Sequence, residues 1–334
     1  MNPALQALIT IAIGVGGCVL YFWLSNIVLD KVLFPARGPQ AGRNINRANL
    51  IRPWLFLLPA LVALGLYLAY PVFATLWLSL HREVGTTREF VGFANYSQMM
   101  GEGKFWESIR NNMLWLVVVP AAATAFGLLA AQLTDRLRWG NFAKSMIFMP
   151  MAISFVGASV IWKLIYDARP AGQDQIGILN AIYIALGGSE PQQWLQIPFW
   201  NNFFLMAVLV WIQAGFAMVI LSAALRAIPE ETIEAAILDG AGPFQIFFKI
   251  KVPQIMSTIV VVWTTITITV LKVFDIVLAM TNGQWETQVL ANYMYDKFFR
   301  AFDVGVGSAA AMVIMLLVSP ILVWNVYNAR KEMR

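Results

Sequence analysis

The sequence contains very few of the residues from which metal centres and catalytic relays are built. Its 334 residues include one cysteine, Cys18, and one histidine, His81. A disulfide framework needs paired cysteines, and zinc or iron–sulfur sites need several Cys or His ligands. A Ser-His-Asp relay needs a placed histidine. The composition therefore leaves almost no room for any of these, and we expect no metal site in this chain.

Charge is also scarce. Only 12% of the residues are charged, whereas soluble domains carry about 25%. Hydrophobic residues make up 59% of the chain, and the mean hydropathy is +0.67. These values indicate that lipid is the main solvent. The formal net charge of +5 is modest, so we read it as a determinant of membrane topology rather than of nucleic-acid binding.

Seven apolar runs are long enough to be membrane helices, since a span needs about 20 apolar residues. They are residues 5–29, 53–80, 111–133, 145–162, 202–225, 254–280 and 305–327. The sixth run contains Lys272 and Asp275 and is the least lipid-like. The pattern predicts an all-α, polytopic membrane helix bundle of about seven transmembrane helices.

The distribution of basic residues predicts the orientation of these spans. The first run is longer than the ~7–15 apolar residues of a signal peptide, and no positive charge precedes it, so we expect an uncleaved span. One set of loops (30–52, 134–144, 226–253, 328–334) holds 14 of the 23 Lys and Arg residues, and the other set holds 8. The positive-inside rule predicts a periplasmic N-terminus and a cytoplasmic C-terminus in a bacterial inner membrane.

Small residues recur at a four-residue spacing on two runs. They are Ala123, Gly127 and Ala131 on one, and Gly307 and Ala311 on the other. Such spacing lets helix backbones approach closely in lipid, although ordinary use of glycine and alanine explains each pair equally well. Residues 178–186 form a short amphipathic stretch that we expect to be a helix on the membrane surface.

The most informative segment is 227–253, AIPEETIEAAILDGAGPFQIFFKIKVP, in a predicted cytoplasmic loop. Pro229 suits the start of a helix, and Glu230 and Glu231 suit its positive end. Gly240 is typical of the position just after a helix, and Pro253 should end the second helix. The segment therefore predicts a helix, a turn and a second helix. It either docks into a cleft of a partner or only caps the bundle, and these two alternatives are equally supported by the residues alone.

This segment resembles the EAA loop of ABC-importer permeases. Glu234-Ala235-Ala236, three residues, Gly240, nine residues, Ile250, one residue and Val252-Pro253 match the family pattern. Val252 stands where the family usually has leucine. Asp239-Gly240-Ala241-Gly242, Val273-Phe274-Asp275 and Thr281-Asn282-Gly283 resemble the carbohydrate branch, and in particular permeases of alpha-glucosides. The resemblance covers about residues 50–330, so residues 1–52 look like an added span with a basic cytoplasmic linker before a permease domain at 53–334.

The resemblance implies a transporter subunit rather than an enzyme. It implies a second homologous permease subunit, two ATP-binding subunits that hold ATP and Mg, and a periplasmic solute-binding protein, and no cofactor bound by this chain. The sequence has no G-x-x-x-x-G-K-[ST] phosphate loop, which is consistent with hydrolysis on another chain. The coupling residues that the resemblance implies are Glu234, Ala235, Ala236, Asp239, Gly240 and Pro253. The implied cargo is a di- or oligosaccharide, such as maltose, trehalose or sucrose, moved by alternating access.

Substrate contacts are expected among polar and aromatic residues within spans, because sugars are uncharged and polyhydroxylated and such residues are costly in lipid. The candidates are Trp211, Gln213, Phe216, Thr269 and Lys272. By the resemblance, Gln213, Phe216 and Thr269 fall at or next to contact positions. Each has a structural alternative: tryptophan packing, threonine bonding to its own helix backbone, and an ion pair of Lys272 with Asp275.

Three other functions compete with a sugar permease. An ion-coupled secondary transporter would need ionisable groups near the membrane midplane, and only Lys272 and Asp275 come close. A membrane enzyme would need a catalytic cluster that the spans lack. An ABC permease for another solute class, such as amino acids, peptides or ions, would also carry an EAA loop.

Overall fold

The computed structural model describes residues 3–85, 87–135 and 137–332. The chain divides into two compact units, Met1–Ala74 and Thr75–Arg334, and each is described by itself. Most of the described residues are helical. The two strands among them, β1 (His81–Val84) and β2 (Thr87–Phe90), form an antiparallel hairpin in which His81 pairs with Phe90. The structure thus confirms the helical membrane bundle that the sequence predicts.

The first unit is a pair of helices joined by a short loop. Its elements are α1 (Pro3–Ile27), η1 (Val28–Leu33), α2 (Ala41–Leu64), η2 (Gly65–Ala69) and the start of α3 (Tyr70–Ser79). The Tyr21 hydroxyl donates to the carbonyl of Leu55 (2.7 Å), and Arg52 pairs with Asp30. Helix α2 begins at Ala41, so the second half of the expected linker 30–52 is helical and continuous with the following span.

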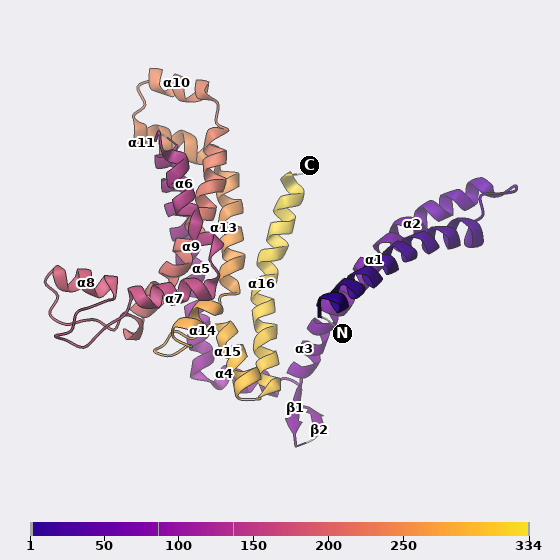
Figure 1. Cartoon of the computed structure of the whole chain (residues 1–334), viewed down its shortest axis with the longest axis horizontal. Coiled ribbons are helices and arrows are strands. Elements are labelled where there is room, and N and C mark those ends of the chain that lie inside the picture. Colours follow the sequence, from indigo (N-terminus) through magenta and orange to yellow (C-terminus); the bar gives the residue numbers. More distant parts are fainter. Residues whose placement is uncertain (1–2, 86, 136, 333–334) are drawn as a thin grey trace. The chain divides into compact units, whose positions relative to one another are not determined.

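The second unit holds the rest of the chain (Figure 1). Its helical elements are α4 (Ala94–Gly101), α5 (Gly103–Thr134), α6 (Gly140–Phe148), η3 (Met149–Ala152), α7 (Phe155–Ile165), α8 (Ile178–Ala185), η4 (Trp194–Gln196), α9 (Trp200–Arg226), α10 (Glu230–Leu238), α11 (Pro243–Gln245), η5 (Ile246–Lys251), α12 (Val252–Gln254), α13 (Met256–Leu271), α14 (Asp275–Met280), α15 (Leu290–Tyr295), η6 (Asp296–Arg300) and α16 (Val304–Glu332).

The core of this unit lies where α5 and α9 pack along their length. Gly127 of α5 approaches α9 so closely that an added Cβ would collide with the Cβ of Ala217 and lie 2.8 Å from the nitrogen of Met218. Ala123 and Ala131, one turn away on either side, are fully buried. The predicted small-residue stripe is therefore confirmed as a helix contact. The second stripe differs, since Gly307 packs against Phe298 of η6 rather than against another span.

All seven apolar runs are helical, but two of them are broken. Four helical segments are long and apolar enough to span a membrane: Pro3–Leu33, Ala41–Ser79, Gly103–Thr134 and Trp200–Arg226. The run 145–162 bends by 106° between Gly140–Ala152 and Phe155–Ile165, so it is not the continuous helix expected. Pro150 and the extended backbone at Ile153 and Ser154 account for this break.

The sixth span is bent as well. Pro243–Gln254 and Met256–Leu271 meet at 71°, and α13 ends before residues 272–274. The seventh apolar run lies within α16, which has 29 residues. The break before α7 and the one at residues 272–274 both border cavities beside α9, where backbone and polar groups are free from helix geometry.

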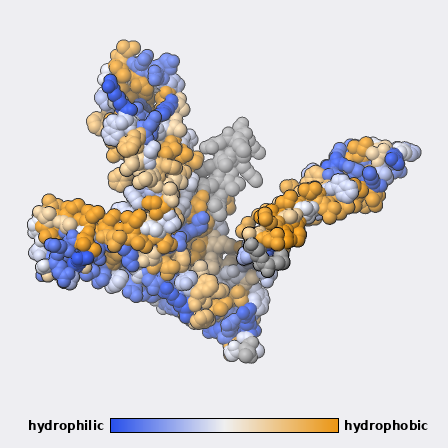
Figure 2. Space-filling model, viewed as in Figure 1, coloured by the Kyte–Doolittle hydropathy of each residue, from blue (hydrophilic) through white to orange (hydrophobic). Residues whose placement is uncertain are grey.

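The second unit has polar elements at both ends. Figure 1 places α10 at one end and the β hairpin with α4 at the other, and α16 runs from the hairpin end towards the α10 end. The surface of the unit carries an apolar stretch along α7 and α8 with a hydrophilic rim beside it (Figure 2). Helix α8 confirms the predicted helix at 178–186, and its exposed face includes Ile178, Ile182 and Leu186.

Candidate coupling segment and central cavity

The segment 227–253 folds as the sequence predicts, into a helix, a turn and a second helix. Helix α10 starts directly after Pro229 and ends at Leu238. Gly240 has a φ of 81° and donates its N–H to the carbonyl of Ile237 (3.0 Å), while Ala241 donates to Ala236 (2.9 Å). This bonding pattern closes the helix end and requires a left-handed residue, which explains the glycine.

The second helix of the segment starts at Pro243 and continues to Gln254, one residue beyond the predicted end at Pro253. The side chain of Gln245 accepts a hydrogen bond from the N–H of Gly242 (3.1 Å), which caps the helix start. We refer to residues 229–254 as the coupling segment. Helix α10 projects at one end of the bundle, and loops join it to α9 and to α11 (Figure 1).

The two alanines of the EAA motif lie on different faces of α10. Ala236 is buried against the chain, whereas Ala235 and Glu234 are exposed, as are Asp239 and Gly240. Large apolar side chains are exposed beside them: Ile237, Leu238, Phe244 and Phe248. Leu238 has 87% of its surface exposed. An apolar patch of this kind outside the spans is typical of a surface that another protein covers, and the sequence analysis missed Ile237 and Leu238.

A network of ionic hydrogen bonds lies at the end of α9, just before the coupling segment begins. Asp135, which follows α5, pairs with Lys144 of α6 and with Arg226 at the end of α9 (2.9 Å). The Ser222 hydroxyl also donates to Asp135 (3.0 Å). Burial raises the pKa of the Asp135 carboxyl, but the hydrogen bonds from Lys144, Ser222 and Arg226 outweigh it and hold the pKa below its ordinary value.

A cavity of about 510 Å³ separates this network from α10. Its lining includes Asp135, Arg226, Glu230, Glu234 and Lys251, so charges of both signs face it. We call it the basal cavity. Glu234, which the resemblance implies is a coupling residue, therefore lies across from basic side chains of its own chain.

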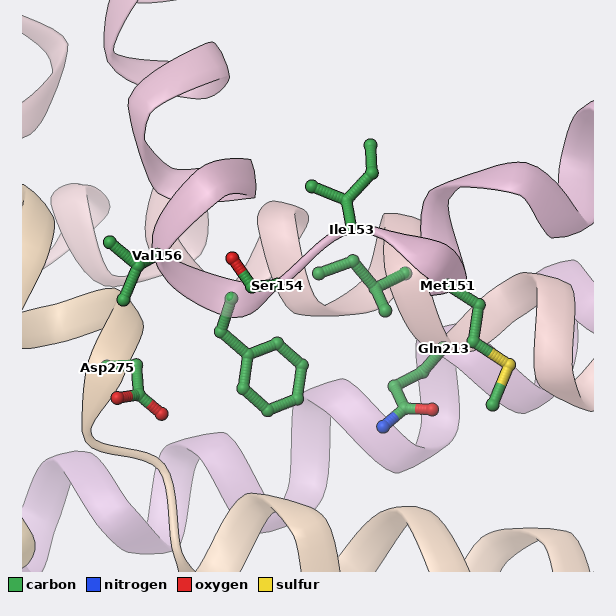
Figure 3. Close-up of a pocket in the computed structure, with 8 residues that line it drawn as sticks. Met151, Ile153, Ser154, Val156, Gln213 and Asp275 are labelled. Atoms are coloured by element: carbon green, nitrogen blue, oxygen red, sulfur yellow. The ribbon is translucent and has the colours of Figure 1, made fainter. Parts of the chain in front are cut away.

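A second cavity, of about 450 Å³, lies where the two helix breaks meet α9. Met151, Ile153 and Ser154 come from the break before α7, Gln213 comes from α9, and Asp275 begins α14. Figure 3 shows the Gln213 amide and the Asp275 carboxylate on different sides of this space, with the Ser154 hydroxyl nearby. We call it the central cavity. Polar groups at interrupted helices are the usual binding elements of membrane transporters.

The predicted substrate residues do not all gather there. Gln213 lines the central cavity, and Thr269 and Lys272 line a smaller adjoining one that shares Phe155 and Asp275 with it. Trp211 packs edge-on against Trp162 at a ring distance of 5.8 Å. Phe216 packs, partly buried, against the core between α5 and α9. The structure thus brings together three of the five candidates.

The structure shows which groups contact Thr269 and Lys272. The Thr269 hydroxyl donates to the carbonyl of Thr265 (3.2 Å), as expected for a threonine within a helix. Lys272 and Asp275 are both described, and no ion pair joins them within the described residues. The expected pair depended on a continuous helix, and α13 ends before Lys272. Lys272 is instead exposed.

Ser154 and Asp275 are cavity residues that the sequence analysis did not select as substrate contacts. Ser154 caps α7 by accepting from the N–H of Gly157 (3.1 Å), and Asp275 occupies the first turn of α14. Pro150 and Ser154, which lie four residues apart within an apolar run, were the available sequence signal for the break before α7. Among the described residues, no cluster of three or more His, Cys, Asp or Glu side chains is placed to hold a metal ion.

Comparison with known proteins agrees with this architecture. A family model described as "Binding-protein-dependent transport system inner membrane component" matches residues 123–332. The alpha-glucoside transport system permease protein AglF of Rhizobium meliloti (strain 1021) is 64% identical over 336 residues, covering 99% of each chain. The osmoprotective compounds uptake permease protein GgtC of Synechocystis sp. (strain ATCC 27184 / PCC 6803 / Kazusa) is 46% identical over 84% of this chain and 100% of its own.

The fold is also found among solved structures. A chain in the crystal structure of a bacterial alginate ABC transporter, in complex with an alginate pentasaccharide-bound periplasmic protein, matches with a TM-score of 0.72. The match covers 88% of this chain and 99% of that chain at 19% identity, which shows a common fold. With its apolar helical spans, the chain is a multi-pass inner membrane protein, and it belongs to the family of inner membrane components of binding-protein-dependent transport systems.

Proposed function

We propose that this chain is the permease subunit of an ATP-driven importer of a di- or oligosaccharide, an alpha-glucoside such as maltose, trehalose or sucrose. The observation that carries the proposal is the 64% identity, over nearly the whole of both chains, to a permease named for alpha-glucoside transport. The central cavity is compatible with this cargo, since Gln213 and Ser154 offer neutral hydrogen-bonding groups beside the ring of Phe155.

In this proposal the chain forms half of the translocation pathway and works by alternating access. A second homologous permease subunit, two ATP-binding subunits that hold ATP and Mg, and a periplasmic binding protein complete the importer. The coupling segment, with Glu234, Ala235, Ala236, Asp239, Gly240 and Pro253, transmits movement of the ATP-binding subunits. Its exposed apolar patch and its hydrogen-bonded turn suit a rigid element that docks into a partner, rather than one that only caps the bundle.

We also propose a periplasmic N-terminus and a cytoplasmic C-terminus, with a first span and basic linker at 1–52 and the transport domain at 53–334. The basic loops support this orientation, and so does the arrangement of the second unit, in which α16 runs towards the end that carries α10 (Figure 1). The coupling segment and the end of the chain then lie on the same side of the membrane, where ATP-binding subunits can reach them.

Substrate contact in the central cavity is assigned to Gln213, with Thr269 and Lys272 in the smaller adjoining cavity, whereas Trp211 and Phe216 line neither of the two. The family, which is described by binding-protein-dependent transport, speaks against the ion-coupled alternative. Import of an osmoprotective compound is the second candidate, because GgtC is named for that activity.

The test is import by the complete complex reconstituted in proteoliposomes with its binding protein. We expect labelled alpha-glucoside to accumulate only with ATP, and Gln213→Ala to lower the import rate about tenfold. Gln173→Ala changes an exposed loop glutamine and should have no effect. Glu234→Lys should abolish import while leaving membrane insertion intact. Import of an osmoprotectant but of no alpha-glucoside would transfer the proposal to the second candidate.

A further inference from the structure

A third cavity, of about 240 Å³, lies between the loop after α7 and the turn after α14. This region is on the side of the second unit away from α10 (Figure 1). Two indole rings, those of Trp194 and Trp285, line it, together with the side chains of Gln193, Gln196 and Asp167. We call it the indole cavity. None of the described residues that line it also lines the central cavity.

The turn that carries Trp285 has a strained backbone. Asn282, Trp285 and Glu286 have φ angles of 54°, 53° and 64°, which are left-handed values that non-glycine residues rarely adopt. Such strain costs of order 1–3 kcal/mol at each residue and persists only where surrounding contacts impose it. The contacts that impose it here can be identified.

Three asparagines hold the turn in place from the ends of two core helices. Asn201 donates to the carbonyl of Trp285 (2.5 Å), and Asn202 donates to that of Glu286 (3.2 Å). Asn111 of α5 donates to the carbonyls of Glu286 (2.9 Å) and Gln288 (2.8 Å). All three asparagines are at most 2% exposed, whereas the Trp285 side chain is 41% exposed. The turn therefore fixes the position of an accessible indole ring.

The lining of the indole cavity selects a particular chemistry. An apolar ligand would displace water from the carboxylate of Asp167 and from the exposed amides of Gln193 and Gln196 without replacing its hydrogen bonds, which is costly. Charges of both signs line the cavity, because Asp167 shares it with Lys163, whose ammonium group donates to the carbonyl of Ala279 (3.3 Å), so the lining favours neither an anion nor a cation. A ring with hydroxyl groups at its edge and C–H groups on its faces meets both requirements, because planar amides and carboxylates bond the hydroxyls and indole faces cover the C–H groups.

The size of the indole cavity limits the ligand further. Pockets that enclose a drug-sized molecule measure ~300–1,000 Å³, so about 240 Å³ suits a single sugar ring rather than a whole disaccharide. We infer that the indole cavity is a second, separate sugar subsite, which holds one pyranose ring of the cargo on the side of the chain away from the coupling segment. This inference rests on the proposed function, because it requires that the cargo be a sugar.

The inference is tested on the full complex in lipid nanodiscs by ligand-observed saturation-transfer NMR, with maltose, trehalose and sucrose as probes. Wild-type complex should transfer saturation to the ring protons of at least one probe. Trp285→Ala and Gln193→Ala should each weaken this binding at least fivefold. Trp139→Ala removes an indole that is 60% exposed and does not line the cavity, and it should leave binding unchanged. Gln193 is an exposed loop residue, so its variant remains informative even if Trp285→Ala disturbs the turn.

Import assays on the same proteins separate the two possible failures. If the wild-type complex imports an alpha-glucoside and both cavity variants bind and import it as the wild type does, the subsite is overturned and the proposed function stands. If the wild-type complex neither binds nor imports any of the three sugars, the proposed function fails and the subsite fails with it. Weakened binding together with an import rate lowered at least threefold in both variants supports the subsite.

Discussion

Arg226 holds Asp135 with two nitrogen atoms, Nη2 at 2.9 Å and Nε at 3.0 Å from the same carboxylate oxygen. Arg226 is the last residue of α9 and stands four residues before the start of α10, while Asp135 directly follows α5. The pair therefore joins the two central helices of the core at the point from which the coupling segment leaves. We expect this contact to transmit movement of α10 from α9 to α5.

Asp135→Asn should weaken coupling while leaving the complex assembled. Asparagine keeps the shape of the side chain but loses the charge that binds Arg226 and Lys144. Charge-assisted hydrogen bonds are roughly twice as strong as neutral ones. We expect the import rate of the reconstituted complex to fall at least threefold, with unchanged amounts of co-purified subunits. The control Asp174→Asn, in the exposed loop before α8, should import normally, and equal import by both variants would contradict the role of Asp135.

The same carboxylate predicts a defined pH dependence. Because its folded-state pKa lies below the ordinary value of an aspartate, its stabilising effect is fully present above the unfolded pKa of about 3.9 and is lost as the pH falls through the folded pKa. The difference in Tm between wild type and Asp135→Asn should therefore stay constant from pH 7 to about pH 5 and shrink below about pH 4. Thermal unfolding in detergent at several pH values measures this difference. A gap that already closes between pH 7 and pH 5 would show that another group titrates.

The close contact of Gly127 with α9 predicts that adding a methyl group at this position lowers the stability of the protein. Gly127→Ala places a Cβ against Ala217 and the backbone of Met218, so the two helices must move apart. Overpacking of this kind costs about 1–3 kcal/mol. Gly103→Ala, on the same helix, meets nothing within 4 Å and should be neutral or slightly stabilising. Detergent melting curves should therefore show a lower Tm for the first variant only, and equal Tm values would refute the close packing.

The sequence allowed the helices and the coupling turn to be predicted because their signals are local. Seven apolar runs, the proline before α10 and the glycine after it all act on their own segment, and the structure has a helix or a turn at each. The small-residue stripe of α5 could be predicted for the same reason. Small residues at a four-residue spacing lie on one face of a helix, and that face can pack closely against another helix.

The helix breaks and the clamped turn could not be predicted in the same way. Pro150 is a local signal for a break before α7, but apolar composition gives no value for the 106° angle. The strained turn at Trp285 depends on Asn201 and Asn111, which are 84 and 174 residues away in the sequence. The central cavity arises from such long-range contacts. For this reason its lining includes Ser154, which was not among the predicted substrate residues, and does not include Trp211, which was.

The apolar patch of the coupling segment gives the last prediction. Leu238 has 87% of its surface exposed although it lies outside the spans, and burying a leucine side chain against a partner contributes about 1.5–3 kcal/mol. Leu238→Ser should therefore lower the affinity for the ATP-binding subunits about tenfold or more, since 1.4 kcal/mol corresponds to a factor of ten. Leu186→Ser, which changes an 83% exposed leucine after α8, is the matched control. Co-purification at graded concentrations measures the two affinities. A loss of affinity in both variants would point to general destabilisation, and no loss in Leu238→Ser would place the docking surface elsewhere on the chain.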